Sequence, residues 1–274
     1  MNDLAVLGRD ALDDIAALCT RAIADPPSVD EIAGSLFTAD QPAVVRGDPS
    51  TGVVATVAGN DGAHIRFLAV DPAARGRGHG HALVEAAEAD ARAGGHRSLS
   101  TGADAPFFLW PGIPATETAL VCLFERHHYF RRETNFDMRV DLAAIPEDPG
   151  GHEFATAADR EEIDRWTQTH WANWRAEVLR ALDKGNLVIV RGDDGIHAFC
   201  AFEVNRTGFL GPVAVRPDLM GRGRGAPALL GALHELRRRG RTCTDVCWVG
   251  PVVPYARVGG SVSNVYFVYR RDLG

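Results

Sequence analysis

The sequence has 274 residues, a length that favours two domains or one large domain. Hydrophobic residues make up 46% and charged residues 24%, which is ordinary for a globular protein and excludes collagen-like, disordered and coiled-coil classes. The formal charge of −7 argues against nucleic acid as a partner, and no apolar run approaches the ~18 residues of a membrane span.

Cysteine usage and the start of the chain bear on the compartment. Five cysteines are an odd number in a chain of this size, and we interpret them as reduced thiols of a cytoplasmic protein. The start lacks a basic segment followed by an apolar one, so we expect no secretory signal. Cys243 and Cys247 have no second cluster at metal-ligand spacing, so we expect no metal site.

The sequence contains two copies of one unit. A shift of 145 residues places Gly76-Arg77-Gly78 on Gly221-Arg222-Gly223, inside a longer match without a gap. The copies are separated by residues 145–151, where two prolines and two glycines prevent helix and central strand alike. We therefore predict an N-terminal domain at 1–145 and a C-terminal domain at 152–274.

The elements of the first copy follow from hydrophobic periodicity and from capping signals. Ser28, with Glu31 three residues later, forms a capping box that begins a second helix. In chain order we predict a helix at 11–24, the helix from Ser28, strands at 42–46, 52–58 and 63–70, a helix at 80–93, a strand at 96–101, a Pro/Gly-rich segment at 103–118 and a strand at 134–141.

The second copy has the same order of elements. We predict an interrupted helix at 159–182, strands at 186–191, 196–204 and 208–215, a helix at 225–239, and strands at 241–248 and 262–270. Helices and strands alternate around one central strand–loop–helix unit in each copy. The fold class is therefore α/β or α+β.

The loop that joins the third strand to the following helix carries the chemistry. Alternating glycines let successive N–H groups point into one concavity, and the helix behind them adds its positive dipole end. Arg75 and Arg77 add positive charge in the first copy, as Arg222 and Arg224 do in the second. This arrangement suits a pyrophosphate, and a tight connection with solvated arginines is the alternative. A Walker loop is excluded because Gly-Lys-Ser/Thr is absent, and a dinucleotide-binding turn fits less well because Val-x-Pro follows the strand.

Arg75-x-x-Gly78-x-Gly80, preceded by Val-x-Pro, is similar to the acyl-CoA loop of the GNAT N-acetyltransferase superfamily. The second copy resembles it too, with Met220 where Gln or Arg is usual. Nearly the whole chain resembles two tandem GNAT-like domains. The resemblance implies, in each domain, a mixed, strongly twisted sheet flanked by helices, with the pantetheine arm of acetyl-CoA between two splayed strands. It implies that the donor is held by Val70, Arg75, Gly76, Arg77, Gly78 and Gly80 in the first copy and by Val213, Val215, Gly221, Arg222, Gly223, Arg224 and Gly225 in the second.

The resemblance also implies direct attack of an amine on the thioester, a base that removes the ammonium proton, and a tyrosine that protonates the leaving thiolate. Tyr255 stands at the tyrosine position of the second copy, whereas the first copy has Phe124, which cannot donate a proton. We therefore predict that the C-terminal domain is catalytic and that the N-terminal domain is structural or holds CoA without turnover. A packed tyrosine with a locally bonded hydroxyl is the alternative for Tyr255.

Candidate bases in the second copy are Glu203, Asp245 and Cys247. Glu203 interrupts an apolar strand, which suggests a cleft position; a strand-end charge that faces water is the alternative. Asp245 and Cys247 alternate on one strand face, where core or edge packing is the alternative. We interpret His127 and His128, near a helix end, as surface or capping residues.

We expect an acyl-CoA-dependent N-acyltransferase that transfers acetyl from acetyl-CoA to a primary amine of a small molecule. A CoA-binding regulatory module without turnover, an acyltransferase with another acyl donor or nucleophile, and a nucleotide-dependent oxidoreductase stay open as alternatives. We expect a cytoplasmic protein without nucleic-acid or membrane partners, either a monomer built as a tandem pseudo-dimer or a homodimer.

Overall fold

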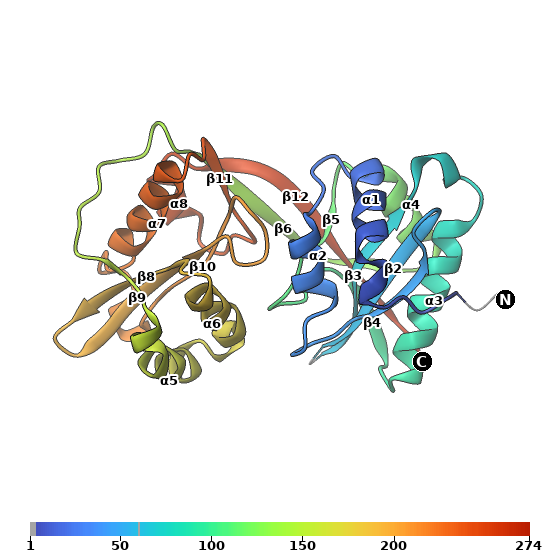
Figure 1. Ribbon diagram of the computed structural model, residues 1–274, viewed down its shortest axis with the longest axis horizontal. Coiled ribbons are helices and arrows are strands. Elements are labelled where there is room, and N and C mark those ends of the chain that lie inside the picture. Colours follow the sequence, from blue (N-terminus) through green and yellow to red (C-terminus); the bar gives the residue numbers. More distant parts are fainter. Residues whose placement is uncertain (1–3, 60) are drawn as a thin grey trace. The chain divides into compact units, whose positions relative to one another are not determined.

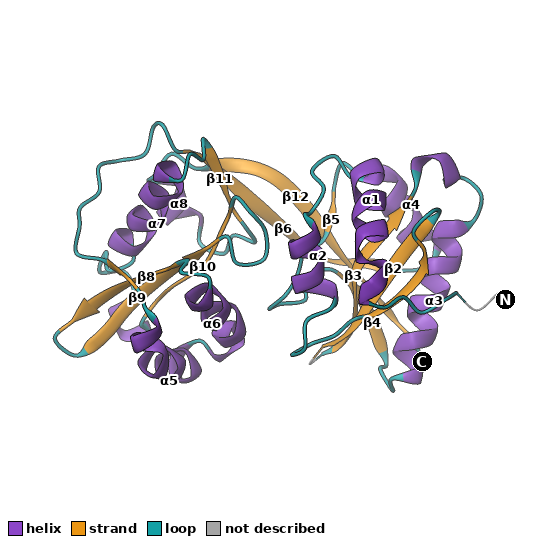
Figure 2. Ribbon diagram, in the orientation of Figure 1, coloured by secondary structure: helices purple, strands orange, loops and turns teal. Residues whose placement is uncertain are grey.

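A computed structural model describes residues 4–59 and 61–274, which divide into two compact units (Figure 1). Unit 1 consists of Met1–Asn135 with Val265–Gly274, and unit 2 is Phe136–Asn264. Each unit is a mixed sheet flanked by helices (Figure 2), so the predicted α/β class and the tandem arrangement are confirmed.

Unit 1 builds its sheet in the order β1-β2-β3-β4-β12, with β5 paired to β12. The β3–β4 pair is parallel and the other pairs are antiparallel. The strands are β1 (Val44–Asp48), β2 (Gly52–Gly59), β3 (Gly62–Val70), β4 (Ser98–Thr101), β5 (Ile113–Pro114) and the last part of β12 (Ser261–Asp272). The helices are α1 (Leu12–Ala22), α2 (Val29–Leu36), α3 (His79–Ala93) and α4 (Thr118–Arg126).

Unit 2 repeats this plan in the order β7-β8-β9-β10-β11-β6, where β10–β11 is the parallel pair. The strands are β7 (Glu153–Phe154), β8 (Leu187–Gly192), β9 (Gly195–Phe202), β10 (Phe209–Val215), β11 (Cys243–Val246) and the end of β6 (Phe130–Asp141). The helices are α5 (Arg160–His170), α6 (Arg175–Asp183), α7 (Ala226–Arg238) and α8 (Val252–Ala256).

Alternating apolar residues bury both faces of the unit 1 sheet. Val53 and Phe67 pack against α1 and α2 on one face, whereas Val54 and Ile65 pack against α3 and α4 on the other. Successive side chains of a strand point to opposite faces, so a strand that is apolar at every position needs helices on both sides. The capping box at Ser28 begins α2, as predicted: its Oγ accepts from the Glu31 N–H, and the Glu31 carboxylate accepts from the Ser28 N–H.

The repeat offset differs along the chain. The expected offset of 145 holds for β3 and β10, where Ala69 and Ala214 are buried in the corresponding cores of their units. Ala69 pairs with Val53, however, and Ala214 pairs with Phe199, so β2 and β9 are offset by one residue more. The chain from Phe199 to Ala214 is therefore one residue shorter than the chain from Val53 to Ala69, a difference that a gap-free comparison of the sequence cannot detect.

The strands that end the two repeats are exchanged between the units. Residues 138–141 of β6, from the first repeat, pair with β11 in unit 2. Residues 270–272 of β12, from the second repeat, pair with β4 in unit 1. The compact units therefore divide the chain differently from the predicted domains 1–145 and 152–274. Both segments are alternating apolar strands with similar sequences, so the pattern does not indicate which sheet receives which strand.

Because strand β12 lies in the sheet of unit 1, we expect a residue near the C-terminus to stabilise unit 1. The Tyr269 ring is buried and stacks on Phe124 at 6.4 Å, and its hydroxyl donates to Glu125 at 3.0 Å. Tyr269→Ala should lower the free energy of unfolding by about 3 kcal/mol or more, whereas Tyr269→Phe keeps the ring and should cost about 1 kcal/mol.

Hydrogen exchange locates the effect. In Tyr269→Ala we expect faster amide exchange in β3 and β4 of unit 1 and little change in β8 and β9 of unit 2. Faster exchange confined to unit 2 would contradict the strand exchange.

Candidate functional site

Unit 1 contains a cavity of about 400 Å³. It lies between β3, α4 and the loop of residues 71–78 that joins β3 to α3, here called the Gly/Arg loop. Its walls come from five segments of unit 1: the end of α1, β3, the loop with the first turn of α3, the segment that leads from β4 to β5, and α4 with the residue before it. The lining includes Val70, Gly78, His81, Trp110, Glu117 and Phe124.

An interrupted strand pair opens this cavity. The parallel pairing of β3 with β4 runs from Ala63–Leu99 to Ile65–Thr101 and ends there. The rest of β3 continues to Val70, paired only on its other side with β2. The gap that the resemblance implies is therefore present, and the free edge of β3 forms one wall of the cavity. A backbone edge of this kind offers N–H and C=O groups to an amide-bearing ligand.

Backbone geometry explains the glycines of the loop. Gly76 and Gly78 have φ values of +75° and +88°, a region that side-chain-bearing residues rarely adopt. A Cβ at either position would meet no atom within 4 Å, so the space above the loop is open. Gly78 caps α3, and its exposed backbone stands at the helix N-terminus. This donor set fits a pyrophosphate.

Packing and hydrogen bonds fix the position of the loop. A Cβ at Gly80 would lie 3.1 Å from Leu123 Cδ2, so glycine allows α3 to approach α4 closely. Arg75 donates from Nε to the Val70 carbonyl and from Nη2 to the Ala22 carbonyl, both at 3.3 Å. The arginine thus ties the loop to the end of β3 and to α1. Of the residues predicted to hold the donor in the first copy, all except Arg77, which is exposed in the loop, line the cavity.

The corresponding loop of unit 2 has the same backbone form but a different setting. Gly221 and Gly223 have φ values of +74° and +76°, with open space above them. A Cβ at Gly225 would lie 2.9 Å from the Val215 side chain. Trp171 donates from Nε1 to the Val215 carbonyl at 3.2 Å, and Val213 packs against the unit 2 core. Side chains of unit 2 thus contact the end of β10, where the resemblance places the donor. Arg222 and Arg224 are exposed in this loop.

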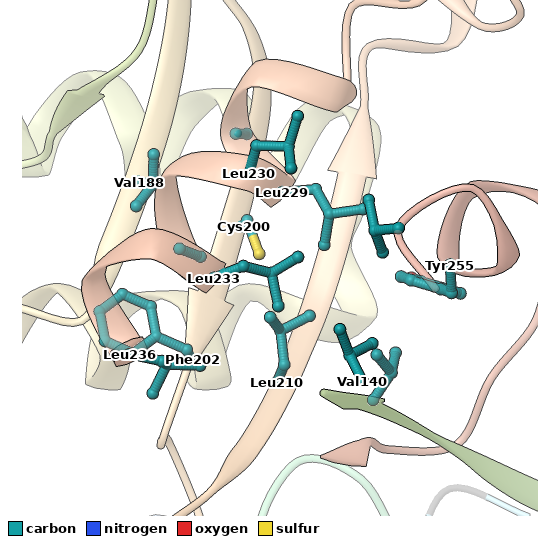
Figure 3. Packing of buried hydrophobic residues seen from close by; sticks show 14 of the residues in the cluster. Val140, Val188, Cys200, Phe202, Leu210, Leu229, Leu230, Leu233, Leu236 and Tyr255 are labelled. Atoms are coloured by element: carbon teal, nitrogen blue, oxygen red, sulfur yellow. The ribbon is translucent and has the colours of Figure 1, made fainter. Parts of the chain in front are cut away.

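Tyr255, the predicted acid, lies in the core of unit 2. Its ring is 7% exposed and packs beside Val140, Leu229 and Leu210 (Figure 3). Burial raises the pKa of the phenol above its usual value, so the hydroxyl stays protonated at neutral pH. Tyr255 does not line the cavity of unit 1. Its role in catalysis stays a prediction.

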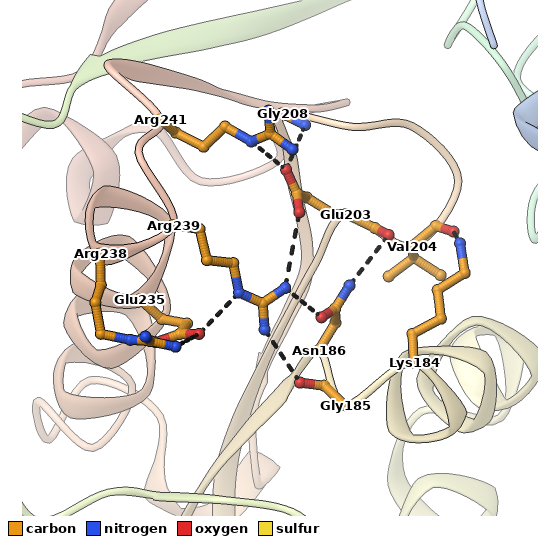
Figure 4. Close-up of polar contacts among 10 residues, drawn as sticks. All are labelled: Lys184, Gly185, Asn186, Glu203, Val204, Gly208, Glu235, Arg238, Arg239 and Arg241. Carbon is orange, nitrogen blue, oxygen red and sulfur yellow. Dashed lines mark hydrogen bonds and ion pairs between the residues drawn. The ribbon is translucent and has the colours of Figure 1, made fainter.

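Glu203 and Asp245, the predicted bases, have partners within unit 2. Glu203 accepts from Arg241 Nε at 2.8 Å and from the Gly208 N–H at 3.0 Å (Figure 4). Asp245 accepts both guanidinium donors of Arg139, at 2.6 and 3.0 Å. In the part of the chain that the structure describes, no hydrogen bond or ion pair joins these carboxylates to each other or to Tyr255.

A buried acidic group of unit 2 escaped the sequence analysis. Glu177 on α6 is 5% exposed and accepts from Asn205 Nδ2 at 3.1 Å. Burial raises its pKa to about 8. The thiol of Cys247 lies near it, and burial followed by the charge of Asp137 raises the pKa of that thiol. A protonated thiol is a poor base, and nothing in the sequence pattern marks Glu177 as buried.

The buried Glu177 predicts a pH-dependent stability. Its folded pKa of about 8 lies above the ordinary glutamate value of 4.5, so protonation favours the folded state. The contribution is complete below about pH 4.5 and is lost as the pH rises to about 8. Glu177→Gln should therefore be more stable relative to wild type at pH ~9 than at pH ~5. A difference in the free energy of unfolding that does not change with pH would contradict the buried position.

Two further groups in unit 1 were also missed. Glu117 precedes α4 and is the one carboxylate among the described residues of the cavity lining. His81 lines the cavity, and its Nδ1 lies 2.8 Å from Nε2 of His127, which the sequence analysis interprets as a surface or capping residue. The two histidines are 46 residues apart, and only the packing of α3 on α4 brings them together.

Within residues 4–59 and 61–274, no group of three or more His, Cys, Asp or Glu side chains is placed to hold a metal ion. No helix in the same ranges is long and apolar enough to cross a membrane.

The sequence and the fold were compared with those of known proteins. Residues 15–106 match the model of the acetyltransferase (GNAT) family. No curated protein matches the sequence significantly.

Several solved structures share the fold of the whole chain. The GCN5-related glucosamine N-acetyltransferase region of a fungal multi-domain GH3 beta-N-acetylglucosaminidase aligns over 98% of this chain, with a TM-score of 0.79 and 21% identity. This chain covers 38% of that protein, well under half its length. A GCN5-related N-acetyltransferase from Sphaerobacter thermophilus aligns over 100% of this chain and 96% of its own, with a TM-score of 0.71 and 20% identity. A tandem GNAT protein from the clavulanic acid biosynthesis pathway aligns over 99% and 98%, with a TM-score of 0.72 and 15% identity.

Proposed function

We propose that the chain is a tandem acetyltransferase of the GNAT type and that it binds acyl-CoA in the cavity of unit 1; the match of residues 15–106 to the GNAT family model and the fold shared with solved GNAT structures support this. We propose that it transfers the acyl group, acetyl in the first place, to a primary amine of a small molecule. One observation carries the proposal: the predicted donor loop of the first copy and the free edge of β3 border the same cavity.

The parts of the cavity suit the parts of an acyl-CoA. The loop N–H groups and the N-terminus of α3 would hold the pyrophosphate, with Arg77 as an exposed positive charge nearby. The free edge of β3 up to Val70 would hydrogen-bond the amides of the pantetheine arm. A volume of about 400 Å³ lies in the ~300–1,000 Å³ range of small-molecule sites. Acetyl-CoA supplies the activated thioester.

The charge of the lining supports an amine as acceptor. Glu117 is half-buried, and a carboxylate in a site of reduced polarity attracts an ammonium group. Trp110 and Leu120 give the same cavity an apolar surface for the body of a small acceptor. We infer that Glu117 binds the acceptor's ammonium and takes its proton.

The reaction in this cavity requires no protein hydroxyl at position 124. The amine nitrogen attacks the thioester carbonyl, the N–C bond forms and the C–S bond breaks. The ammonium proton that Glu117 takes before the attack is released to solvent, and the second proton, which the nitrogen loses as the amide forms, passes through water to the CoA thiolate. The products are an amide, CoA thiol and one released proton. Phe124, which lines the cavity, contributes a buried apolar wall.

Matched charge substitutions in the two loops test the donor site. Gly78 and Gly223 share a positive φ and open space, so Gly78→Asp and Gly223→Asp cost similar backbone strain. Each places a negative charge where a pyrophosphate would bind. We expect Gly78→Asp to weaken acetyl-CoA binding at least about tenfold, and Gly223→Asp to change it less than about twofold, as measured by calorimetry. The reverse order would place the donor in unit 2.

Activity measurements test the acceptor side and the place of the chemistry. With acetyl-CoA and a panel of primary amines, Glu117→Gln should lower kcat/KM at least about tenfold while acetyl-CoA affinity stays unchanged.

Tyr255→Phe decides between the units: an unchanged rate supports catalysis in unit 1, and a large loss of kcat supports the sequence-based prediction for Tyr255. Products should be separated by chromatography, because the exposed thiols of Cys122 and Cys243 react with thiol reagents. Tight CoA binding without any turnover would favour a binding module.

A further inference from the structure

Two histidines connect the cavity of unit 1 to a buried carboxylate. His81, in the first turn of α3, lines the cavity and is exposed. Its Nδ1 lies 2.8 Å from Nε2 of His127, which follows α4, and the ring centroids are 4.9 Å apart. A hydrogen bond between two imidazoles requires one ring to donate and the other to accept.

The surroundings of His127 decide which ring accepts. Its side chain is 11% exposed, and its Nδ1 lies 3.9 Å from Oε1 of Glu88. Burial lowers the pKa of His127, and the charge of Glu88 opposes this effect, so the ring is neutral at neutral pH. A neutral ring that keeps its proton on Nδ1, toward the carboxylate, accepts at Nε2. His81 is therefore the donor.

Several other charged groups lie around the His81–His127 pair. Glu88 is bound by Arg271 of β12 at 2.6 Å and faces Arg92 of its own helix at 3.6 Å. Glu85 of α3 also faces His127, as does Arg271. The hydroxyl of Tyr129 lies near Glu88. Groups of both charges thus surround the histidine pair.

An anion bound in the cavity changes the charge that surrounds the His81 ring. Its Nδ1–H is committed to His127, which leaves Nε2 as the nitrogen that can take up a proton. The positive end of the α3 dipole and the exposed Arg126, which also lines the cavity, place positive charge beside this ring. Phosphate groups bound in the loop would add negative charge on the cavity side of the same ring.

We propose that His81 and His127 form a proton-coupled anion-binding element of the donor site: CoA binding places a proton on His81 Nε2, and the resulting imidazolium pairs with the phosphates of CoA. His127 acts as the positioning residue that fixes the His81 ring, with Glu88 behind it. This inference rests on the proposed function because its ligand is CoA.

Proton uptake measured on binding tests the inference. CoA is titrated into the full-length protein at pH ~7.5 by calorimetry, in two buffers with different ionisation enthalpies and without phosphate. We expect an uptake of about half a proton or more per CoA and an affinity that falls as the pH rises, by at most about tenfold per pH unit. Pantetheine, which carries no phosphate, should bind without uptake.

Variants identify the group that takes up the proton. His81→Asn should abolish the uptake and make CoA affinity independent of pH, and His127→Gln should reduce both effects. His79→Asn, two residues earlier on the same helix, is the matched control and should keep the uptake. CoA binding without uptake in the wild type, or equal uptake in His81→Asn, would overturn the inference and leave the proposed donor site intact. An absence of CoA binding to the wild type would overturn both.

Discussion

The site in unit 1 depends on one interruption of backbone pairing. The parallel pair β3–β4 ends at Ile65–Thr101, and β3 continues to Val70 with β2 as its strand partner on the other side. A backbone edge without a strand partner must satisfy its polar groups with other groups, with water or with a ligand. The same interruption leaves room for the cavity and directs the chain into the Gly/Arg loop, so the strand edge, the loop and the start of α3 converge on one space. The donor proposal follows from this convergence.

The two units share that plan and differ in what fills it. In unit 1 the end of β3 contacts Arg75, which reaches it from the loop and leaves the cavity open. In unit 2 the end of β10 contacts the indole of Trp171, and Val213 and Val215 pack against the core that holds Tyr255. The glycine pattern is nearly identical in both repeats because it serves the backbone form of the loop. Side chains from distant elements thus make the surroundings of the two loops different.

Local patterns in the sequence predict most of the elements. Periodicity and capping place α1 to α3 within a few residues and predict an interrupted helix over 159–182, where α5 and α6 lie, and the alternating glycines predict the loop. Three features depend on tertiary packing and stay hidden. The exchange of β6 and β12 escapes because the two ends are similar strands. The burial of Glu177 escapes because a glutamate in a helix is almost always exposed, and the His81–His127 contact escapes because it needs α3 packed on α4.

Hydrogen exchange with and without acetyl-CoA tests the central claim most directly, because it reads both units in one experiment without any substitution. The account predicts slower exchange on ligand binding in residues 66–70 of β3 and in the loop 75–80, with little change in residues 213–225 of unit 2. Slower exchange in residues 213–225 with none in residues 66–80 would contradict the assignment of the donor site to unit 1.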